Sequence, residues 1–150
     1  MKVVIQRVQE AAVKTGGEIK SEIGAGLLVL VGFEAEESSE EMQWMASKIA
    51  NLRIFNDDAG AMNFSVKDVN GELLAVSQFT LHATTKKGNR PSFNRAAPAD
   101  AAITFYKEFI TLLAIASGRD ILTGAFGADM QVSLVNDGPV TIIIDSKNKE

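Results

Sequence analysis

The order of hydrophobic and polar positions predicts a sheet in the first part of the chain. Residues 1–13 are rich in β-branched side chains, which favours a strand. The Gly16-Gly17 pair is a turn signal, so residues 18–23 can return as a hairpin partner. Residues 27–31 form a short apolar run after a glycine-rich break, which predicts a buried strand. Because those glycines precede the strand, they do not form the phosphate loop of a dinucleotide-binding fold.

Two later segments have the spacing of amphipathic helices. Ser38 and Glu41 match a capping box, and the residues behind them are apolar at intervals of three and four. That apolar stripe consists of Met42, Met45, Ile49 and Leu52. A second helix is predicted to open at Pro98 and to stop at Gly118.

A turn and a long loop are predicted between the two helices. Asn70-Gly71 is a hairpin turn signal that would join residues 65–69 to a strand over residues 72–81. Residues 82–98 then form a long polar loop, and loops of that length are usually functional or disordered.

The C-terminal part of the chain completes the predicted fold. Apolar strands are expected at residues 130–135 and 140–145, and the polar tail, residues 146–150, is expected to fray. Together the elements predict a single α+β domain over residues 1–145. Its core would be a largely antiparallel sheet or small β-barrel with two main helices.

Composition narrows the chemistry that the chain can perform. With 150 residues, 46% of them hydrophobic, it is long enough to form one globular domain. The absence of cysteine excludes disulfides, thiolate metal sites and a cysteine nucleophile, and a single histidine argues against a zinc hydrolase. We therefore expect no metal and no cofactor. The longest apolar run is far shorter than the roughly 20 residues of a membrane helix, so we expect a cytoplasmic protein without a membrane partner.

The charges are unevenly distributed along the chain. The net charge is −4, yet residues 73–99 contain four Lys or Arg and no acid, so the rest of the chain carries −8. This basic stretch includes Lys86, Lys87 and Arg90, with Phe93 among them. Aromatic side chains beside basic ones are typical of surfaces that bind single-stranded RNA ends. The alternative is an ordinary solvated loop.

The segment before the basic stretch carries candidate nucleophiles. It consists of Ser77, Gln78, Phe79 and Thr80. Strand alternation would place Ser77 and Phe79 on one face, and Gln78 and Thr80 on the other. Either hydroxyl could attack a substrate, but no general base is obvious. His82 is expected to be a loop residue rather than a base.

A second unusual segment lies between the two C-terminal strands. It runs from Asn136 through Gly138 and Pro139 to Thr141. Proline between apolar strands requires an edge, a bulge or a turn, and glycine before it permits unusual backbone geometry. The segment is interpreted either as a hairpin turn or as a rigid backbone wedge whose carbonyls face a ligand.

The two segments together resemble the two signature motifs of the D-aminoacyl-tRNA deacylases. Further stretches are similar to that family, so the resemblance covers residues 1–145. These stretches are residues 6–8, 24–31, 51–55, 88–93 and 126–135. The resemblance implies a homodimer that hydrolyses the ester between a D-amino acid and the 3′ end of tRNA. It also implies that glycyl-tRNA is a substrate.

The resemblance assigns roles to individual residues. Residues 77–80 would form the catalytic segment. The expected tRNA contacts, Lys86, Lys87, Arg90 and Phe93, follow from the basic stretch itself. The Gly138-Pro139 peptide would be cis and would enter the other subunit's site, where its carbonyls would reject the side chain of an L-amino acid. Asn136 and Thr141 belong to the same motif, and Arg7 would fix the orientation of Gly138 and Pro139.

Several alternatives remain open from the sequence. Thr80 could act as nucleophile, or the 2′-hydroxyl of the terminal ribose could activate water, and the lack of a base near Thr80 favours the second mechanism. The competing functions are a non-catalytic RNA-binding dimer that uses the basic loop, and a small-molecule-binding or structural dimer.

Overall fold

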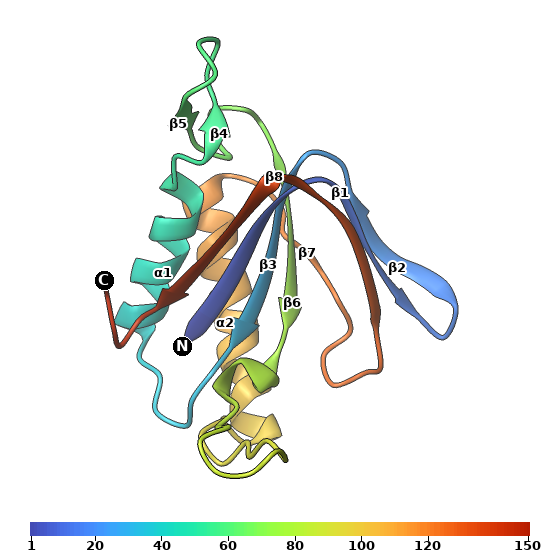
Figure 1. The fold of residues 1–150 in the computed structure, drawn as a ribbon, viewed down its shortest axis with the longest axis vertical. Helices are drawn as coiled ribbons and strands as arrows, with labels where there is room; N and C mark the ends of the chain where they lie inside the picture. The colour runs from blue at the N-terminus through green and yellow to red at the C-terminus, as the bar shows by residue number, and fades with distance from the viewer.

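A six-stranded mixed sheet forms the centre of the fold, and two helices pack side by side against one of its faces (Figure 1). The computed structural model describes residues 1–150. In chain order the elements are β1 (Lys2–Thr15), β2 (Glu18–Ile23), β3 (Gly26–Gly32), α1 (Ser39–Asn51), β4 (Phe55–Asn56), β5 (Met62–Phe64), β6 (Glu72–Ser77), the 3-10 helix η1 (Phe79–His82), α2 (Ala99–Ser117), β7 (Leu122–Thr123) and β8 (Gln131–Asp145).

Strand β1 is the centre of the sheet. It pairs antiparallel with β2, β3 and β8, while β3 with β6 and β6 with β7 run parallel. The long strands bend, so that the sheet has a nearly closed barrel shape (Figure 1). The predicted α+β class is confirmed, with a mixed rather than uniformly antiparallel sheet. The three predicted N-terminal strands are also confirmed as β1, β2 and β3.

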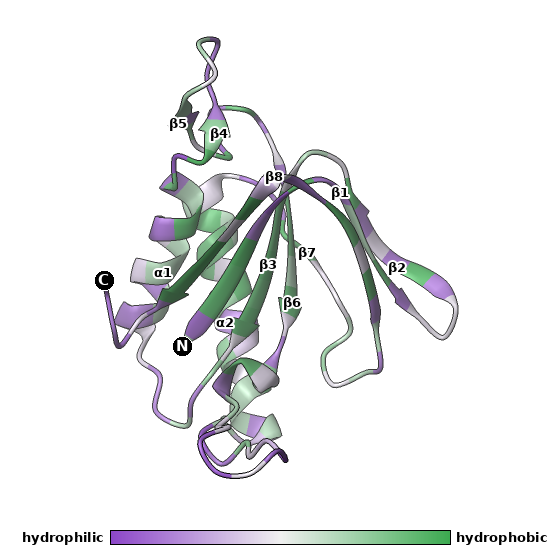
Figure 2. Cartoon of the chain, in the orientation of Figure 1, coloured by the Kyte–Doolittle hydropathy of each residue, from purple (hydrophilic) through white to green (hydrophobic).

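Both predicted helices are confirmed, and their apolar stripes form the core with the sheet. Ser38 caps α1 by accepting a hydrogen bond from the Glu41 N–H at 3.1 Å, and Gly118 ends α2 in the left-handed conformation. Met45, Ile49 and Phe109 are fully buried against the strands. Figure 2 shows the hydrophobic colour concentrated along the central strands. No helix is both long enough and apolar enough to cross a bilayer.

The predicted hairpin at Asn70-Gly71 is wrong. Residues 65–69 form a turn rather than a strand, because the Asp68 carboxylate accepts a hydrogen bond from the Ser65 N–H at 2.8 Å. The Ser65 hydroxyl in turn accepts one from the Asp68 N–H at 3.2 Å. Strand β6 therefore begins after the turn and pairs with β3, which is distant in sequence.

The predicted strand over residues 72–81 is also too long. β6 ends at Ser77, where the Gln78 N–H donates to the Val31 carbonyl at 2.7 Å, and the chain then turns into η1. Gly32 permits this turn, because a Cβ there would lie 2.7 Å from the Gln78 carbonyl oxygen. The predicted alternation beyond Ser77 is therefore wrong. His82, predicted to be a loop residue, is instead a buried residue of η1.

The C-terminal segment corrects two further predictions. Residues 130–135 and 140–145 belong to one strand, β8, and both halves pair with β1, so the hairpin interpretation is wrong. The tail does not fray at its start. Ser146 is buried, its N–H donates to the Met1 carbonyl at 2.9 Å, and its hydroxyl accepts from the Met1 amino group at 2.8 Å.

Candidate active site

A cavity of about 540 Å³ opens at the carboxyl ends of β3 and β6. Ser77, Gln78 and Phe79 form part of its wall. The remaining wall comes from the start of α2 and from residues 126–132, and it is mostly apolar. The structure therefore places three of the four residues of the first motif at a concave surface large enough for a small organic group.

The motif residues differ in exposure and in hydrogen bonding. Ser77 and Gln78 are half-buried, whereas Phe79 and Thr80 are exposed. The Gln78 side-chain amide donates to the Thr80 hydroxyl oxygen at 2.7 Å. Phe79 and Thr80 are the first residues of η1, so their backbone N–H groups have no acceptor within that helix. Exposed N–H groups beside a cavity can stabilise a developing oxyanion.

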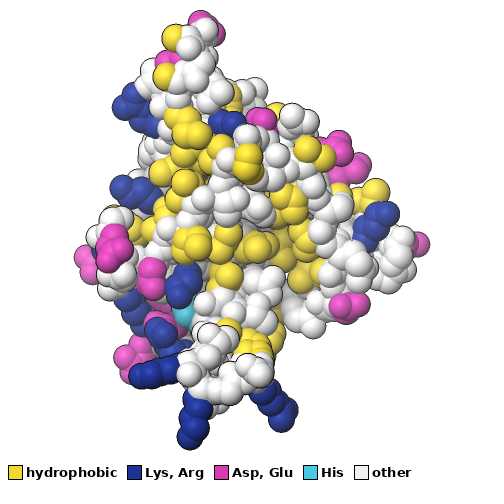
Figure 3. Space-filling view, in the orientation of Figure 1, with side chains coloured by type: hydrophobic (Ala, Val, Ile, Leu, Met, Phe, Trp, Pro, Cys, Tyr) yellow, Lys and Arg dark blue, Asp and Glu magenta, His cyan; other side chains and the backbone are white.

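The basic loop reaches this site through an aromatic contact. The rings of Phe79 and Phe93 meet edge to face, with centroids 5.1 Å apart. Lys86, Lys87 and Arg90 are exposed on the same loop and form no ion pair within the protein. Figure 3 shows Lys and Arg side chains projecting at this end of the molecule. Of the predicted RNA-contacting residues, Phe93 thus contacts the first motif, and the three basic residues lie on the same loop as Phe93.

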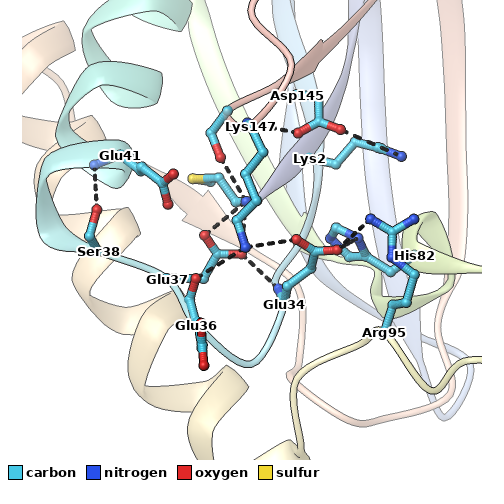
Figure 4. A network of polar contacts seen from close by, with 12 residues as sticks. Lys2, Glu34, Glu36, Glu37, Ser38, Glu41, His82, Arg95, Asp145 and Lys147 are labelled. Atoms are coloured by element: carbon cyan, nitrogen blue, oxygen red, sulfur yellow. Dashed lines mark hydrogen bonds and ion pairs between the residues drawn. The ribbon is translucent and has the colours of Figure 1, made fainter.

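A polar network lies behind η1 and was missed from the sequence (Figure 4). Its centre is Glu34, which pairs with Arg95 at 2.7 Å and with Lys147 at 2.8 Å, while Nδ1 of His82 lies 3.6 Å from Glu34 Oε1. Burial disfavours the charge of Glu34, but hydrogen bonds from Lys147 and Arg95 and the nearby positive charges lower the pKa of its carboxyl to about 2. No sequence pattern connects these residues. Only the isolated histidine was visible.

The second motif forms a bulge in β8. Gln6 of β1 pairs with Thr141 of β8, and Val8 pairs with Asn136. Four residues of β8, 137–140, therefore lie opposite the single residue Arg7 of β1. Within this bulge Gly138 and Pro139 are exposed and their peptide bond is cis. Gly138 has a φ of 135°, a conformation that favours glycine.

Two side chains hold the base of this bulge. The Asn136 amide donates to the carbonyls of Arg7 at 3.0 Å and Val140 at 2.9 Å. Buried Arg7 donates from Nε to the Asp137 carbonyl at 3.0 Å and from Nη1 to the Ile54 carbonyl at 2.7 Å. Thr141 is exposed, and its hydroxyl accepts a hydrogen bond from the Gln6 amide at 3.3 Å. Asn136 and Arg7 thus fix the backbone on both sides of the exposed Gly138-Pro139 peptide.

The structure does not bring the two motifs together within one chain. Arg7, beside the bulge, is level with Leu27 on β3 and Leu73 on β6, whereas the first motif starts at Ser77. The offset is about four residues along the strands, roughly 13 Å, and three strand spacings across the sheet, roughly 14 Å. Gly138 and Pro139 are also absent from the cavity wall.

Comparison with known proteins identifies the family. Residues 4–145 match the family described as D-Tyr-tRNA(Tyr) deacylase, and the chain belongs to this family. It is 57% identical, over 150 residues and the whole of both chains, to proteins of Parabacteroides distasonis and Flavobacterium psychrophilum that are each named D-aminoacyl-tRNA deacylase. A solved structure titled c-Myc DNA Unwinding Element Binding Protein is also similar. Its TM-score is 0.91 and its identity 45%, covering 97% of this chain and 98% of that one.

Proposed function

We propose that this protein hydrolyses the ester bond of D-aminoacyl-tRNA and releases the D-amino acid and tRNA. The observation that carries the proposal is the cavity walled by Ser77, Gln78 and Phe79, in a chain whose full-length relatives are named as such deacylases. The cavity would take the aminoacyl group, and the exposed Lys86 and Lys87 would contact the phosphates of the tRNA end.

The hydrogen bonding of Thr80 supports water rather than Thr80 as the nucleophile. Its hydroxyl oxygen accepts from the Gln78 amide, which has no lone pair on nitrogen available to take a proton. In the mechanism that we favour, the 2′-hydroxyl of the terminal ribose activates water. Water adds to the ester carbonyl carbon, the bond to the 3′-oxygen breaks, and that oxygen takes the proton. The N–H groups of Phe79 and Thr80 would stabilise the oxyanion.

The selection of D-amino acids would come from Gly138 and Pro139 of a second subunit. Since the bulge lies far from the cavity of its own chain, a homodimer offers a way to bring the two motifs into one site. The exposure of Gly138 and Pro139 supports their insertion into a partner. Their backbone carbonyls would repel the side chain of an L-amino acid regardless of its type. Glycyl-tRNA has no side chain to reject, so it would be cleaved as well.

An exposed apolar surface supports the homodimer. Ile143 of β8 is a large hydrophobic residue that is 68% exposed. Figure 3 shows hydrophobic side chains gathered across the middle of the sheet face, over β8, β1 and β3. A contiguous apolar patch on a sheet face is typical of a protein–protein interface, and a second copy of this chain would cover it.

The proposed activity is tested by measuring amino acid release from D-tyrosyl-tRNA and L-tyrosyl-tRNA with purified protein. We expect release from the D-substrate and from glycyl-tRNA, and none above background from the L-substrate. Salt-sensitive tRNA binding without release would support the non-catalytic RNA-binding alternative instead. The absence of both binding and release would leave only a small-molecule-binding or structural role.

The donation of the wedge across the dimer is tested with mixed subunits. Gly138→Ala adds a Cβ that would lie 2.7 Å from a Val140 methyl group, so it should disturb the wedge. Ala128→Trp places an indole at the exposed edge of the cavity and should block it. Since the wedge carbonyls would also hold the amino group of the substrate, each variant alone should be nearly inactive. A 1:1 mixture after subunit exchange should regain about one quarter of wild-type activity, because half of the dimers would carry one intact site.

The mixture distinguishes the two arrangements. If the wedge served its own chain, no mixed dimer would contain an intact site and the activity would not return. Gly16→Ala is the matched control for Gly138→Ala, since Gly16 also has a positive φ but its added Cβ would meet nothing within 4 Å. Gly16→Ala should keep full activity and selectivity. Equal losses in both variants would mean that the effect of Gly138→Ala is not specific to the wedge.

A further inference from the structure

His82 is a buried residue that the proposed mechanism does not use. It is the only histidine of the chain, it is 3% exposed, and neither ring nitrogen has a hydrogen-bond partner. Buried polar atoms without a partner are rare in folded proteins and unfavourable. Such a group therefore calls for an explanation, and its position at the end of η1, two residues after Thr80, places that explanation next to the site.

The charged group that faces His82 is Glu34. Its Oε1 lies 3.6 Å from Nδ1 of His82, just beyond hydrogen-bond distance. Since the pKa of the Glu34 carboxyl is held at about 2, this group stays ionised at neutral and mildly acidic pH. Protonation would turn Nδ1 into a donor aimed at a permanent carboxylate.

The other charges of the network determine how strongly the pair can respond. Arg95, from the basic loop, binds the same Oε1 of Glu34, while Lys147, from the C-terminal tail, binds Oε2. Glu37 lies behind Glu34, accepts a hydrogen bond from the Glu34 N–H at 2.7 Å and pairs with the amino group of Met1 (Figure 4). The Glu34 carboxylate thus already forms ion pairs with two cations, and a protonated His82 would share Oε1 with the exposed Arg95.

Movement of His82 would be transmitted to the site over a short distance. η1 is a single turn of four residues, Phe79–His82. It crosses Gly32 so closely that a Cβ there would lie 3.0 Å from the His82 ring and 2.7 Å from the Gln78 carbonyl oxygen. The turn is therefore held at both ends. A change in the contact of His82 reaches the backbone N–H groups of Phe79 and Thr80 through three peptide units.

We propose that Glu34 and His82 are positioning residues for the deacylation site. Protonation of His82 draws its ring onto Glu34 Oε1, fixes the end of η1 and thereby aligns the N–H groups of Phe79 and Thr80. The part of this proposal that concerns catalysis rests on the proposed function. The contact between Glu34 and His82 does not, so it can be tested separately.

The contact is tested by following the imidazole protons by NMR as a function of pH, since a single histidine gives an unambiguous signal. In Glu34→Gln the titration midpoint should move to lower pH, because the carboxylate that stabilises the protonated ring is gone. Glu36→Gln is the matched control. It removes the same charge two residues away, from an exposed side chain that forms no ion pair, and should leave the midpoint unchanged. An unchanged midpoint in Glu34→Gln would overturn the proposal.

The positioning role is tested by single-turnover release from D-tyrosyl-tRNA between pH 5.5 and 8. The ratio of the wild-type rate to the His82→Phe rate cancels the intrinsic pH dependence of the ester. We expect this ratio to fall at least threefold as pH rises. When both proteins also carry Glu34→Gln, the ratio should not change with pH. His82→Asn serves as the second variant if His82→Phe does not fold. A ratio that is independent of pH for both His82 variants would overturn the positioning role. No release by the wild type would instead refute the proposed function.

Discussion

Replacing Arg7 with methionine is expected to destabilise the protein and to loosen the Gly138-Pro139 bulge. Arg7 is buried, and its guanidinium donates to the backbone carbonyls of Ile54 at 2.7 Å and Asp137 at 3.0 Å. Methionine fills similar space but donates nothing, so both carbonyls lose their partner. Asp137 also loses an ion pair of 3.4 Å.

The size of the effect follows from those contacts. Hydrogen bonds from a charged donor contribute about 1.5–3 kcal/mol each, so two of them give about 3–6 kcal/mol. Relief from burying the guanidinium offsets part of this. We therefore expect the free energy of unfolding to fall by about 3–4 kcal/mol, and Tm by about 6–16 °C for a domain of this size.

The measurement is urea unfolding followed by circular dichroism, together with the ratio of release from D- and L-tyrosyl-tRNA. Arg53→Met is the matched control, because Arg53 also donates to a carbonyl, that of Asn63 at 2.9 Å, but at the exposed surface. Its cost should stay below about 1 kcal/mol. A loss of less than about 1 kcal/mol in Arg7→Met would refute the assignment of Arg7 as a buried clamp. A large loss with unchanged D/L selectivity would show that the clamp does not orient the wedge.

Four further predictions concern Ser38, Tyr106 and Glu34. Ser38→Ala should cost about 1 kcal/mol in urea unfolding, because the Glu41 N–H loses its cap, and no loss would contradict the cap. Tyr106→Phe should cost about 1–2 kcal/mol, since the hydroxyl donates to the buried Ala75 carbonyl at 2.8 Å. Burial raises the pKa of Tyr106 to about 12, so ultraviolet titration of this single tyrosine should show no ionisation at pH 10, and stability should fall as pH rises from 10 to 12. The pKa of Glu34 is lowered from 4.5 to about 2, so its stabilisation is present above pH 4.5 and lost toward pH 2. The difference in unfolding free energy between wild type and Glu34→Gln should shrink over that range.

Elements whose pattern is local were predictable from the sequence. The Ser38 cap and the apolar stripe behind it define α1, and the β-branched N-terminal segment defines β1. These elements follow from side-chain periodicity and capping, which depend on neighbouring residues alone. Gly118 ends α2 for a similarly local reason, since its φ of 70° suits glycine.

Strand partners were not predictable, because pairing is set by contacts distant in sequence. The Asn70-Gly71 turn is real, but the strand after it pairs with β3 in parallel. Gly26 makes that pairing possible, since a Cβ there would overlap the Glu72 backbone. The two apolar runs of β8 likewise lie in line on β1 instead of folding back on each other. A turn signal tells where a chain bends and does not tell which strand it meets next.

The candidate site shows the same division. Residues 77–80 stand out in the sequence by their hydroxyl groups and their position before the basic loop, and three of them line the cavity. The opposite wall, residues 126–132, and the Glu34 carboxylate behind η1 come from segments that only the folded chain brings near. No spacing rule relates Glu34 to His82, which are 48 positions apart.

The separation of the two motifs within one chain bears on how the site is completed. Residues 77–80 supply the cavity wall and the N–H groups at one end of the sheet, whereas Gly138 and Pro139 project from the other. A buried arginine and an asparagine hold the base of the bulge by hydrogen bonds, while the tip of the bulge stays exposed. Backbone held in this way is suited to recognise a substrate by shape, because its carbonyls cannot move aside for a misplaced side chain. Exposure of the tip and distance from the chain's own cavity both favour a site completed by a second copy of the protein.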